Sequence, residues 1–148
     1  MKRLRFILFI CCTIACLSCK TNQFNKVGQR HGRWEFADTL GTQVYKYGGR
    51  YKNGIECGKW KYHLGGKLAR KEKYRKNISY NQFFHENGKV SSRGKSQLDV
   101  SAAEIHWYYF GDWEYFDETG RLTMVKTFEN GKQVKVRKMD PATPKTAL

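Results

Sequence analysis

The sequence is short of the residues that build a helical core or a disulfide-bonded one. Leucine, isoleucine and valine are sparse after residue 20, whereas the 148-residue chain holds 9 Tyr, 9 Phe and 4 Trp. A helical core built from leucine is therefore not expected, and the aromatic segments favour pleated sheet. Beyond residue 19 the only cysteine is Cys57, so we expect no disulfide within the chain. We interpret Cys57 as a small, partly buried residue, with a bridge between chains as the alternative.

Catalytic motifs are missing as well. The sequence has no Ser-His-Asp arrangement with a recognisable elbow and no glycine loop for phosphate. His63 and His85 fall at one repeat position, but a metal site needs three or four converging ligands, and no further ligand stands at the right spacing. The sequence also contains an acidic cluster, which consists of Asp112, Glu114, Asp117 and Glu118. We interpret these residues as parts of turns and solvated faces; the alternative is a catalytic pair, which would have to face a cleft. We predict no enzymatic activity, no cofactor and no metal site.

The amino terminus has the order of an export signal. Lys2, Arg3 and Arg5 precede an uncharged run of 12 residues, 6–17. Such a run fits the apolar region of a signal peptide and is too short to span a bilayer comfortably. We predict that residues 1–18 are an export signal; the alternative is a short buried strand or helix at the edge of the domain.

The four residues at 16–19, Cys-Leu-Ser-Cys, resemble a bacterial lipobox. The resemblance implies that Cys19 carries a diacylglyceryl thioether, with the small Ser18 before the cut, and that two or three acyl chains hold the protein on a membrane. Cys16 stands where that motif usually has leucine, and Cys16 itself is the alternative attachment site. The residue after the attachment site is Lys20 and not the Asp that resembles an inner-membrane retention signal. In a Gram-negative-type envelope, this implies that the protein is held in the outer membrane.

Basic residues outnumber acidic ones throughout the chain. There are 28 Lys and Arg against 13 Asp and Glu, a formal net charge of +15. They are spread along the sequence, so we interpret most of them as a solvated surface. Weak attraction to anionic lipid headgroups or acidic envelope polymers is a secondary effect. We do not predict nucleic acid as a partner, because an exported protein rarely meets it.

An internal repeat organises the rest of the chain. The pattern Gly-x-Trp-x-aromatic occurs three times, at 32–36, 58–62 and 111–115, and a degenerate copy lies at 80–90. Each copy continues to a Gly turn, and the first and last reach Asn-Gly at 53–54 and 130–131. Period-two alternation puts both rings of a copy on one strand face, and Asn-Gly between such runs indicates a hairpin. The sequence predicts tandem hairpins with Trp34, Trp60 and Trp113 in the core.

These residues resemble MORN-repeat variants of the type found in YwqK-like antitoxin proteins, over about residues 28–133. The resemblance implies an all-β fold in which tandem antiparallel β-hairpin repeats form an extended twisted sheet, and it implies a protein partner. This chain departs from the pattern in three places. The third unit lacks its Trp and its leading Gly, and the segment from Ser96 to His106 is an insertion without a counterpart. The first unit is two residues longer between Gly41 and Gly54 than the last unit is between Gly120 and Gly131.

The predicted organisation is a signal peptide at 1–18, a tether at 19–29, a repeat domain at 30–134 and a mobile tail at 135–148. We predict a non-enzymatic, lipid-anchored envelope protein that acts as a protein-interaction or scaffold module; the alternative is a protein that binds glycan or anionic lipid. Trp107, Tyr108 and Tyr109 form the candidate binding surface, because aromatic rings suit sugars and protein partners. Their alternative role is core packing.

Overall fold

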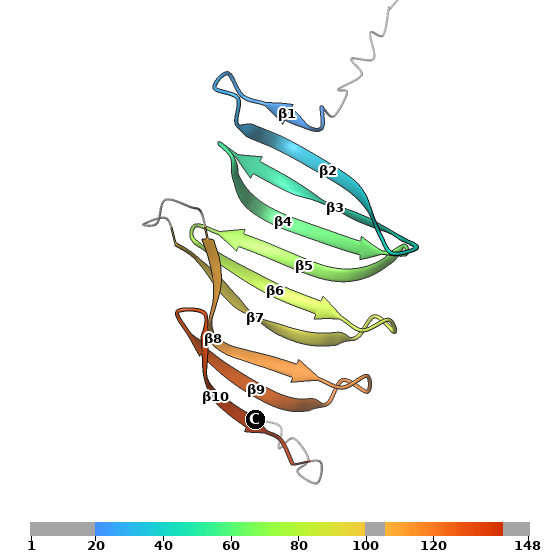
Figure 1. Ribbon diagram of the computed structural model, residues 1–148, viewed down its shortest axis with the longest axis vertical. Coiled ribbons are helices and arrows are strands. Elements are labelled where there is room, and N and C mark those ends of the chain that lie inside the picture. The colour runs from blue at the N-terminus through green and yellow to red at the C-terminus, as the bar shows by residue number, and fades with distance from the viewer. Residues whose placement is uncertain (1–19, 100–105, 141–148) are drawn as a thin grey trace, which may run out of the picture.

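The computed structural model describes residues 20–99 and 106–140, which form one open antiparallel sheet (Figure 1). Each strand pairs with its neighbours in the sequence, so the described strands lie in the order β1 to β10. The prediction of an all-β sheet of tandem hairpins is confirmed. The strands are β1 (Gln23–Phe24), β2 (Arg30–Leu40), β3 (Gln43–Lys52), β4 (Ile55–Leu64), β5 (Lys67–Arg75), β6 (Ile78–Phe84), β7 (Val90–Asp99), β8 (His106–Phe116), β9 (Leu122–Glu129) and β10 (Lys132–Lys138).

The Asn-Gly dipeptides form the hairpin turns that the sequence predicts. Asn53 and Gly54 have φ of 51° and 81°, and Asn130 and Gly131 have φ of 48° and 80°. Positive φ at both central residues is the geometry that matches the twist of the flanking strands. The amide of Gly54 also donates to the carbonyl of Arg30, at 2.9 Å, and Gly131 donates in the same way to Tyr109, at 3.0 Å. Each turn is thereby tied to the preceding hairpin.

Most of the buried hydrophobic residues are aromatic and lie on one face of this single sheet. Trp34, Trp60 and Trp113 are 7%, 2% and 1% exposed, so their predicted place in the core is confirmed. Within the described residues no second layer covers them, and the burial comes from neighbouring rings and from the sheet itself. Phe36 and Tyr47 stack across β2 and β3 with ring centroids 4.7 Å apart, and Tyr47 and Tyr62 continue the row into β4 at 5.7 Å. We call this side of the sheet the aromatic face.

Two of the tryptophans lie flat over a glycine of the strand before them. A Cβ atom at Gly49 would stand 2.2 Å from the ring of Trp60, and one at Gly94 would stand 2.2 Å from Trp113. Both glycines sit where the pairing register with the next strand shifts by a bulge. Each indole donates to the carbonyl of the residue after its glycine, Arg50 at 3.2 Å and Lys95 at 3.0 Å. The same arrangement of glycine, bulge and indole therefore occurs twice, and each time it buries a tryptophan ring against the backbone of the single sheet.

The boundaries at both ends of the domain differ from the prediction. Within the expected tether at 19–29, β1 pairs with β2, and Phe24 packs edge-on against Trp34 with centroids 5.0 Å apart. The expected tail at 135–148 begins inside β10, which continues to Lys138 opposite Met124. Edge strands are held by backbone hydrogen bonds and need no buried side chains, so their sequences show little pattern. Part of the expected insertion also belongs to the sheet, because Ser96 and the residues up to Asp99 extend β7 and pair with β8.

Several predictions concern residues outside the described ones. The signal peptide at 1–18, Cys19, residues 100–105 of the insertion and residues 141–148 of the tail all lie there. Every pairing between the described strands falls within residues 23–138, so a form of the protein that begins at Lys20 keeps all of these pairings. Among the residues that the structure describes, none forms a helix that could cross a membrane.

Candidate binding surfaces

The face of the sheet opposite the tryptophans is rich in cations. Because side chains alternate along a strand, Lys59 and Lys61 flank the buried Trp60 on the opposite face of β4. Lys71 and Lys73 lie on that face of β5, on either side of the buried Glu72. All four lysines are exposed. The alternation that buries aromatic residues on one face therefore gathers cations on the other.

The four lysines stand opposite one another in like-charged pairs. The register of β4 and β5 places Lys59 against Lys73 and Lys61 against Lys71. Side chains in directly opposed positions have Cβ atoms about 4.5–5.5 Å apart, and like charges there destabilise a sheet. Within the described residues none of the four makes an ion pair with a carboxylate. We call Lys59, Lys61, Lys71 and Lys73 the lysine quartet.

Other cations of this face do have acidic partners. Arg33 also stands opposite a like charge, Arg50, but Glu35 contacts its guanidinium at 2.6 Å. On the far side of the face, Arg93 is paired with Glu114. The quartet thus lies between two ion-paired arginines, Arg33 on β2 and Arg93 on β7. None of its own charges is paired with a carboxylate of the described residues, and the ammonium of Lys71 lies 5.1 Å from the centre of the Phe84 ring.

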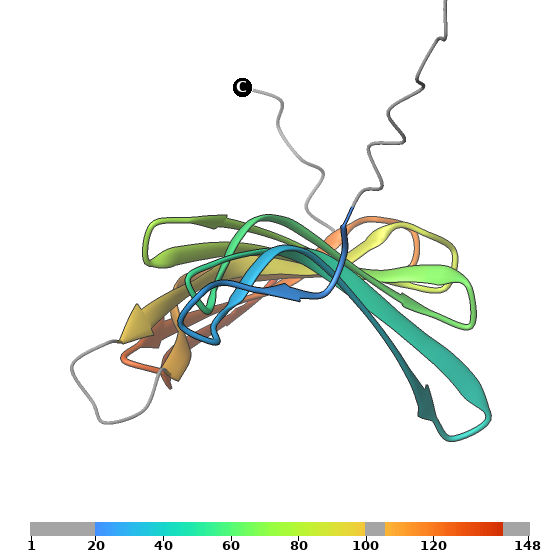
Figure 2. The same ribbon diagram turned by 90° about the horizontal axis from the view of Figure 1, so that it is seen from above.

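The basic face is hollow. It holds two adjoining grooves of about 760 and 840 Å³, which share Lys59 and Lys61 as lining residues. One groove extends from these lysines to Arg33 on β2 and the other to Glu114 on β8. The sheet is arched when seen along its length (Figure 2), and the grooves are lined by residues of neighbouring strands from β2 to β8. We call the two together the basic trough; it runs across the strands.

One aromatic side chain stands among the cations of the trough. Tyr80 of β6 lies opposite Lys73 on one side and Lys95 on the other. It is 42% exposed, and the ammonium of Lys95 lies 5.9 Å from the centre of its ring. A ring of this kind offers an apolar surface inside an otherwise charged groove.

The aromatic face is interrupted by a buried carboxylate. Glu72 is 8% exposed and accepts hydrogen bonds from the hydroxyls of Tyr62, at 2.6 Å, and Tyr74, at 2.7 Å. Arg70 lies 3.4 Å from the same carboxylate, with its guanidinium 3.7 Å from the centre of the Tyr62 ring. Burial and the neighbouring charge of Glu72 raise the pKa of Tyr62 and of Tyr74. Burial acts to lower the pKa of the Arg70 guanidinium, but Glu72 and the neighbouring phenols together outweigh it and raise that pKa.

Asn81 explains why the third unit has no tryptophan. It occupies the row of Trp60 on the aromatic face, and its neighbour on β5 is Glu72 where the units of Trp60 and Trp113 have a glycine. An indole has no glycine to lie over at this place. Asn81 is instead buried in a polar network, accepting a hydrogen bond from Ser79 at 3.2 Å and donating to Ser96 at 3.0 Å. The degenerate unit is therefore adapted to a polar stretch of the core.

The structure does not bring the predicted aromatic surface together. Trp107 and Tyr109 lie on the aromatic face, where Trp107 meets Tyr74 edge-on at 5.2 Å, whereas Tyr108 points to the other side because strand side chains alternate. Tyr109 is 40% exposed, yet its ring centroid lies 4.0 Å from that of Trp113. The contacts of Trp107 and Tyr109 are therefore packing contacts with other rings of the aromatic core.

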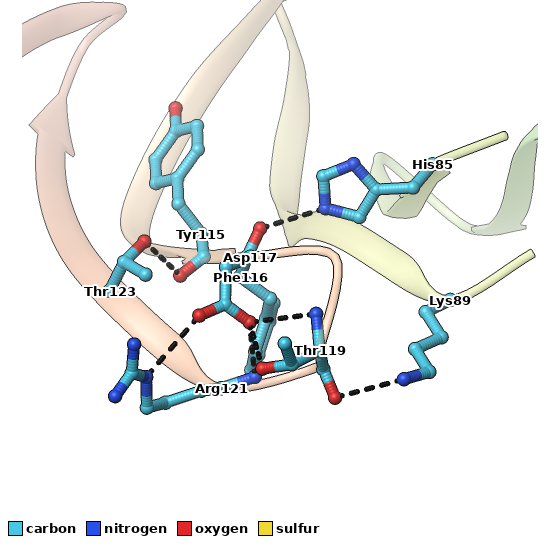
Figure 3. Close-up of polar contacts among 8 residues, drawn as sticks. All are labelled: His85, Lys89, Tyr115, Phe116, Asp117, Thr119, Arg121 and Thr123. Carbon is cyan, nitrogen blue, oxygen red and sulfur yellow. Dashed lines mark hydrogen bonds and ion pairs between the residues drawn. The ribbon is translucent and has the colours of Figure 1, made fainter. Parts of the chain in front are cut away.

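Of the histidines and the acidic cluster, His85 and Asp117 serve the connections between hairpins (Figure 3). His85 lies 2.9 Å from the carbonyl oxygen of Phe116 through its Nε2 atom, and Lys89 donates to the carbonyl of Thr119 at 3.1 Å, so the turn after β6 docks on the turn after β8. Asp117 closes that second turn, and hydrogen bonds from Thr119 and from the amide of Arg121 lower its pKa to about 2.

The remaining candidates from the sequence do not converge. His63 lies on the basic face of β4, away from His85. Cys57 is a free, half-buried thiol. No group of three or more His, Cys, Asp or Glu side chains that could hold a metal ion occurs in residues 20–99 and 106–140.

The lysine quartet was missed at the level of sequence because its members are far apart there. Lysine alternates with other residues at 59–61 and again at 71–73, a pattern that could have shown one charged face on each strand. Which lysines meet depends on the pairing register, and that is a property of the fold.

Comparisons with known proteins give no family for this chain. No protein-family model matches it, and no curated protein matches it. Among solved structures it is similar to a chain in the crystal structure of a GtfA/B complex, with 13% sequence identity and a TM-score of 0.25. The match covers 78% of this chain and spans 20% of the length of the other, a likeness too slight to carry an argument about fold or function.

Proposed function

We propose that this protein is a non-enzymatic binding module of the cell envelope, built from MORN-like repeats, whose hollow basic face holds an anionic component of the envelope. The observation that supports this most directly is the lysine quartet. Four exposed ammonium groups meet in two like-charged pairs without a carboxylate of the described residues to balance them. A sheet that keeps this arrangement gains affinity for anions at some cost in its own stability.

Attachment at Cys19 places this module at a membrane surface. In the proposal, removal of residues 1–18 leaves Cys19 as the first residue of the mature chain, acylated and held in the outer membrane where the envelope has one. Changing Cys19 to Ala should block the acylation of the chain and its normal processing. Cys16→Ala is the matched control, since it alters the neighbouring thiol and should leave both unchanged. A Cys19 variant that stays in the membrane fraction and is processed normally would refute the attachment.

The binding role has its own test, which does not depend on the lipid. A form comprising residues 20–148 is mixed with isolated envelope material and sedimented at low and at high ionic strength. We expect it to sediment with the envelope at low salt and to be released by about 1 M salt, where the screening length falls to about 3 Å. No sedimentation at low salt, or sedimentation that salt does not affect, would contradict the proposal.

A protein partner is the second candidate, and the outer edge of β10 favours it. Among the described strands β10 pairs only with β9, and Val134 and Val136 are 53% and 43% exposed. An exposed edge can accept a strand from another protein, although the lysines of β10 discourage such pairing. Capture of partners from solubilised membranes tests this function. A partner that the double change of Val134 and Val136 to Lys releases would support it, and unaltered capture would contradict it.

A further inference from the structure

We propose that the basic trough binds an acidic polysaccharide, with the lysine quartet holding its carboxylate or phosphate groups and Tyr80 packing against a sugar ring. The inference rests on the proposed function, because it names the class of anion that the hollow face holds. It goes beyond that function by assigning the site to five residues.

The charges of the quartet call for an anion between them. On one strand Lys59 and Lys61 are two residues apart, about 7 Å along the chain, and β4 and β5 are about 5 Å apart. The four side chains therefore rise from the corners of a small rectangle on flexible four-carbon stems. An anionic group placed above this rectangle meets two or more ammonium groups at once and removes the like-charge repulsion. A polymer that carries such groups at intervals also reaches the cations farther along the trough, among them Arg75 and Lys95.

The shape of the site favours a chain over a flat surface. The trough is a groove that runs across the strands, since its lining residues come from neighbouring strands between β2 and β8. A planar layer of lipid headgroups would meet the rims of this groove before it reached its floor. A slender polymer can lie along the floor, so the observations favour a polymer over an anionic membrane.

The chemistry of the trough favours a glycan over an acidic peptide. The backbone groups of β4, β5, β6 and β7 are paired within the sheet ladder, so a peptide lying across them would find no backbone donors or acceptors to match its own. A polysaccharide has no peptide groups to satisfy. It presents hydroxyls and charged groups to the lysines and the apolar face of a ring to Tyr80, which is exposed at the level of the quartet.

Binding of defined polymers to the form comprising residues 20–148 tests the inference. The probes are polygalacturonate as an acidic glycan, dextran as a neutral one, polyglutamate as an acidic polypeptide, and vesicles of phosphatidylglycerol. We expect polygalacturonate to bind more tightly than polyglutamate or vesicles and dextran not to bind. Changing the four quartet lysines to Gln should weaken polygalacturonate binding by about tenfold or more. A control with Lys26, Lys132, Lys135 and Lys138 changed to Gln loses the same charge outside the trough and should change binding by less than about twofold.

Tyr80 separates sugar recognition from simple charge attraction. Tyr80→Ala should weaken polygalacturonate binding while leaving polyglutamate binding unchanged, and Tyr80→Phe, which keeps the ring, should restore it. The quartet variant should melt at the same temperature as the unaltered protein or above it, since it removes repulsion, and this shows that a loss of binding is not a loss of fold.

The outcomes separate this inference from the function on which it rests. Equal loss of polygalacturonate binding in the quartet and control variants overturns the site. Tighter binding of polyglutamate or of vesicles than of polygalacturonate refutes an acidic polysaccharide as the ligand. The envelope-binding function then still stands if salt-sensitive sedimentation persists. Absence of that sedimentation overturns the function itself.

Discussion

Replacing Gly94 with alanine tests whether the tryptophans hold this one-layer sheet by lying flat on glycine. The added Cβ would stand 2.2 Å from the ring of Trp113, more than an ångström inside the 3.4 Å at which ordinary contact begins. Trp113 is 1% exposed, so its ring has no free space on the sheet and must lift away from it. The φ of Gly94 is not in the left-handed region, and backbone strain therefore does not add to the effect.

The expected cost follows from what the ring loses. Overpacking of this size costs about 1–3 kcal/mol, and a lifted indole also loses its hydrogen bond to the carbonyl of Lys95 at 3.0 Å, worth about 1 kcal/mol. We expect Gly94→Ala to lower the free energy of unfolding by about 3 kcal/mol. In urea, with a slope of about 1.5 kcal/mol per molar, the midpoint should fall by about 2 M at unchanged slope.

A double-mutant cycle gives the decisive measurement. In a Trp113→Leu background the clash is gone, and Gly94→Ala should then cost nothing or stabilise the protein by about 0.4–1 kcal/mol, because alanine lowers the entropy of the unfolded chain. The same cycle at Gly49 and Trp60 is an independent test of the same arrangement. An equal cost of the alanine in both backgrounds would refute the explanation of the core.

Three further predictions follow from the buried phenols, the turn carboxylate and the aromatic strand. Because the pKa values of Tyr62 and Tyr74 are raised above 10, their contribution to the stability of the fold is fully present below pH 10 and is lost as the pH rises above it. Tyrosinate absorbance should show that these two phenols ionise only as the protein unfolds. Ionisation of both phenols in the folded state would count against this prediction. Because the pKa of Asp117 is lowered to about 2, its carboxylate stabilises the turn above pH 3.8, and this stabilisation is lost as the pH falls towards 2. An NMR titration of the carboxyl group measures this pKa, and titration near 4 would contradict the prediction. Tyr109→Ala should cost about 2 kcal/mol and Trp107→Ala a similar amount in urea unfolding, because both rings pack in the core; a cost below about 0.5 kcal/mol would return them to a binding role.

The repeat could be predicted from the sequence because its signals are local. Asn53-Gly54 and Asn130-Gly131 fix two turns by their backbone preference alone, and alternation around Trp60 fixes which side chains share a face. The edge strands could not be predicted in this way. The outer strand β10 is exposed along its whole length and is held by backbone hydrogen bonds to β9, so no buried side chains mark it in the sequence.

The binding surface was harder to predict, for two different reasons. Trp107, Tyr108 and Tyr109 were grouped because they are adjacent in the sequence, although adjacent residues of a strand lie on opposite faces. The lysine quartet was overlooked because its members are separated in the sequence by up to a whole hairpin. Side chains that are close together in the sequence of a strand are thus not necessarily close together on one face of the sheet, and a ligand site depends on the second.

A single bulge decides where these lysines stand. The β4–β5 hairpin begins with Leu64 opposite Lys67, and a register shift between Tyr62 and His63 moves every later pair by one residue. Continued without the shift, that register would set Lys59 against Glu72 in an ion pair. The shift sets it against Lys73 instead, and it keeps Glu72 on the aromatic face beside Tyr62. A one-residue slip reverses the faces of a strand, so the bulge that completes the core also gathers the cations. The basic trough is therefore a consequence of how the aromatic face is closed, and binding an anion there offsets the repulsion that this closure creates.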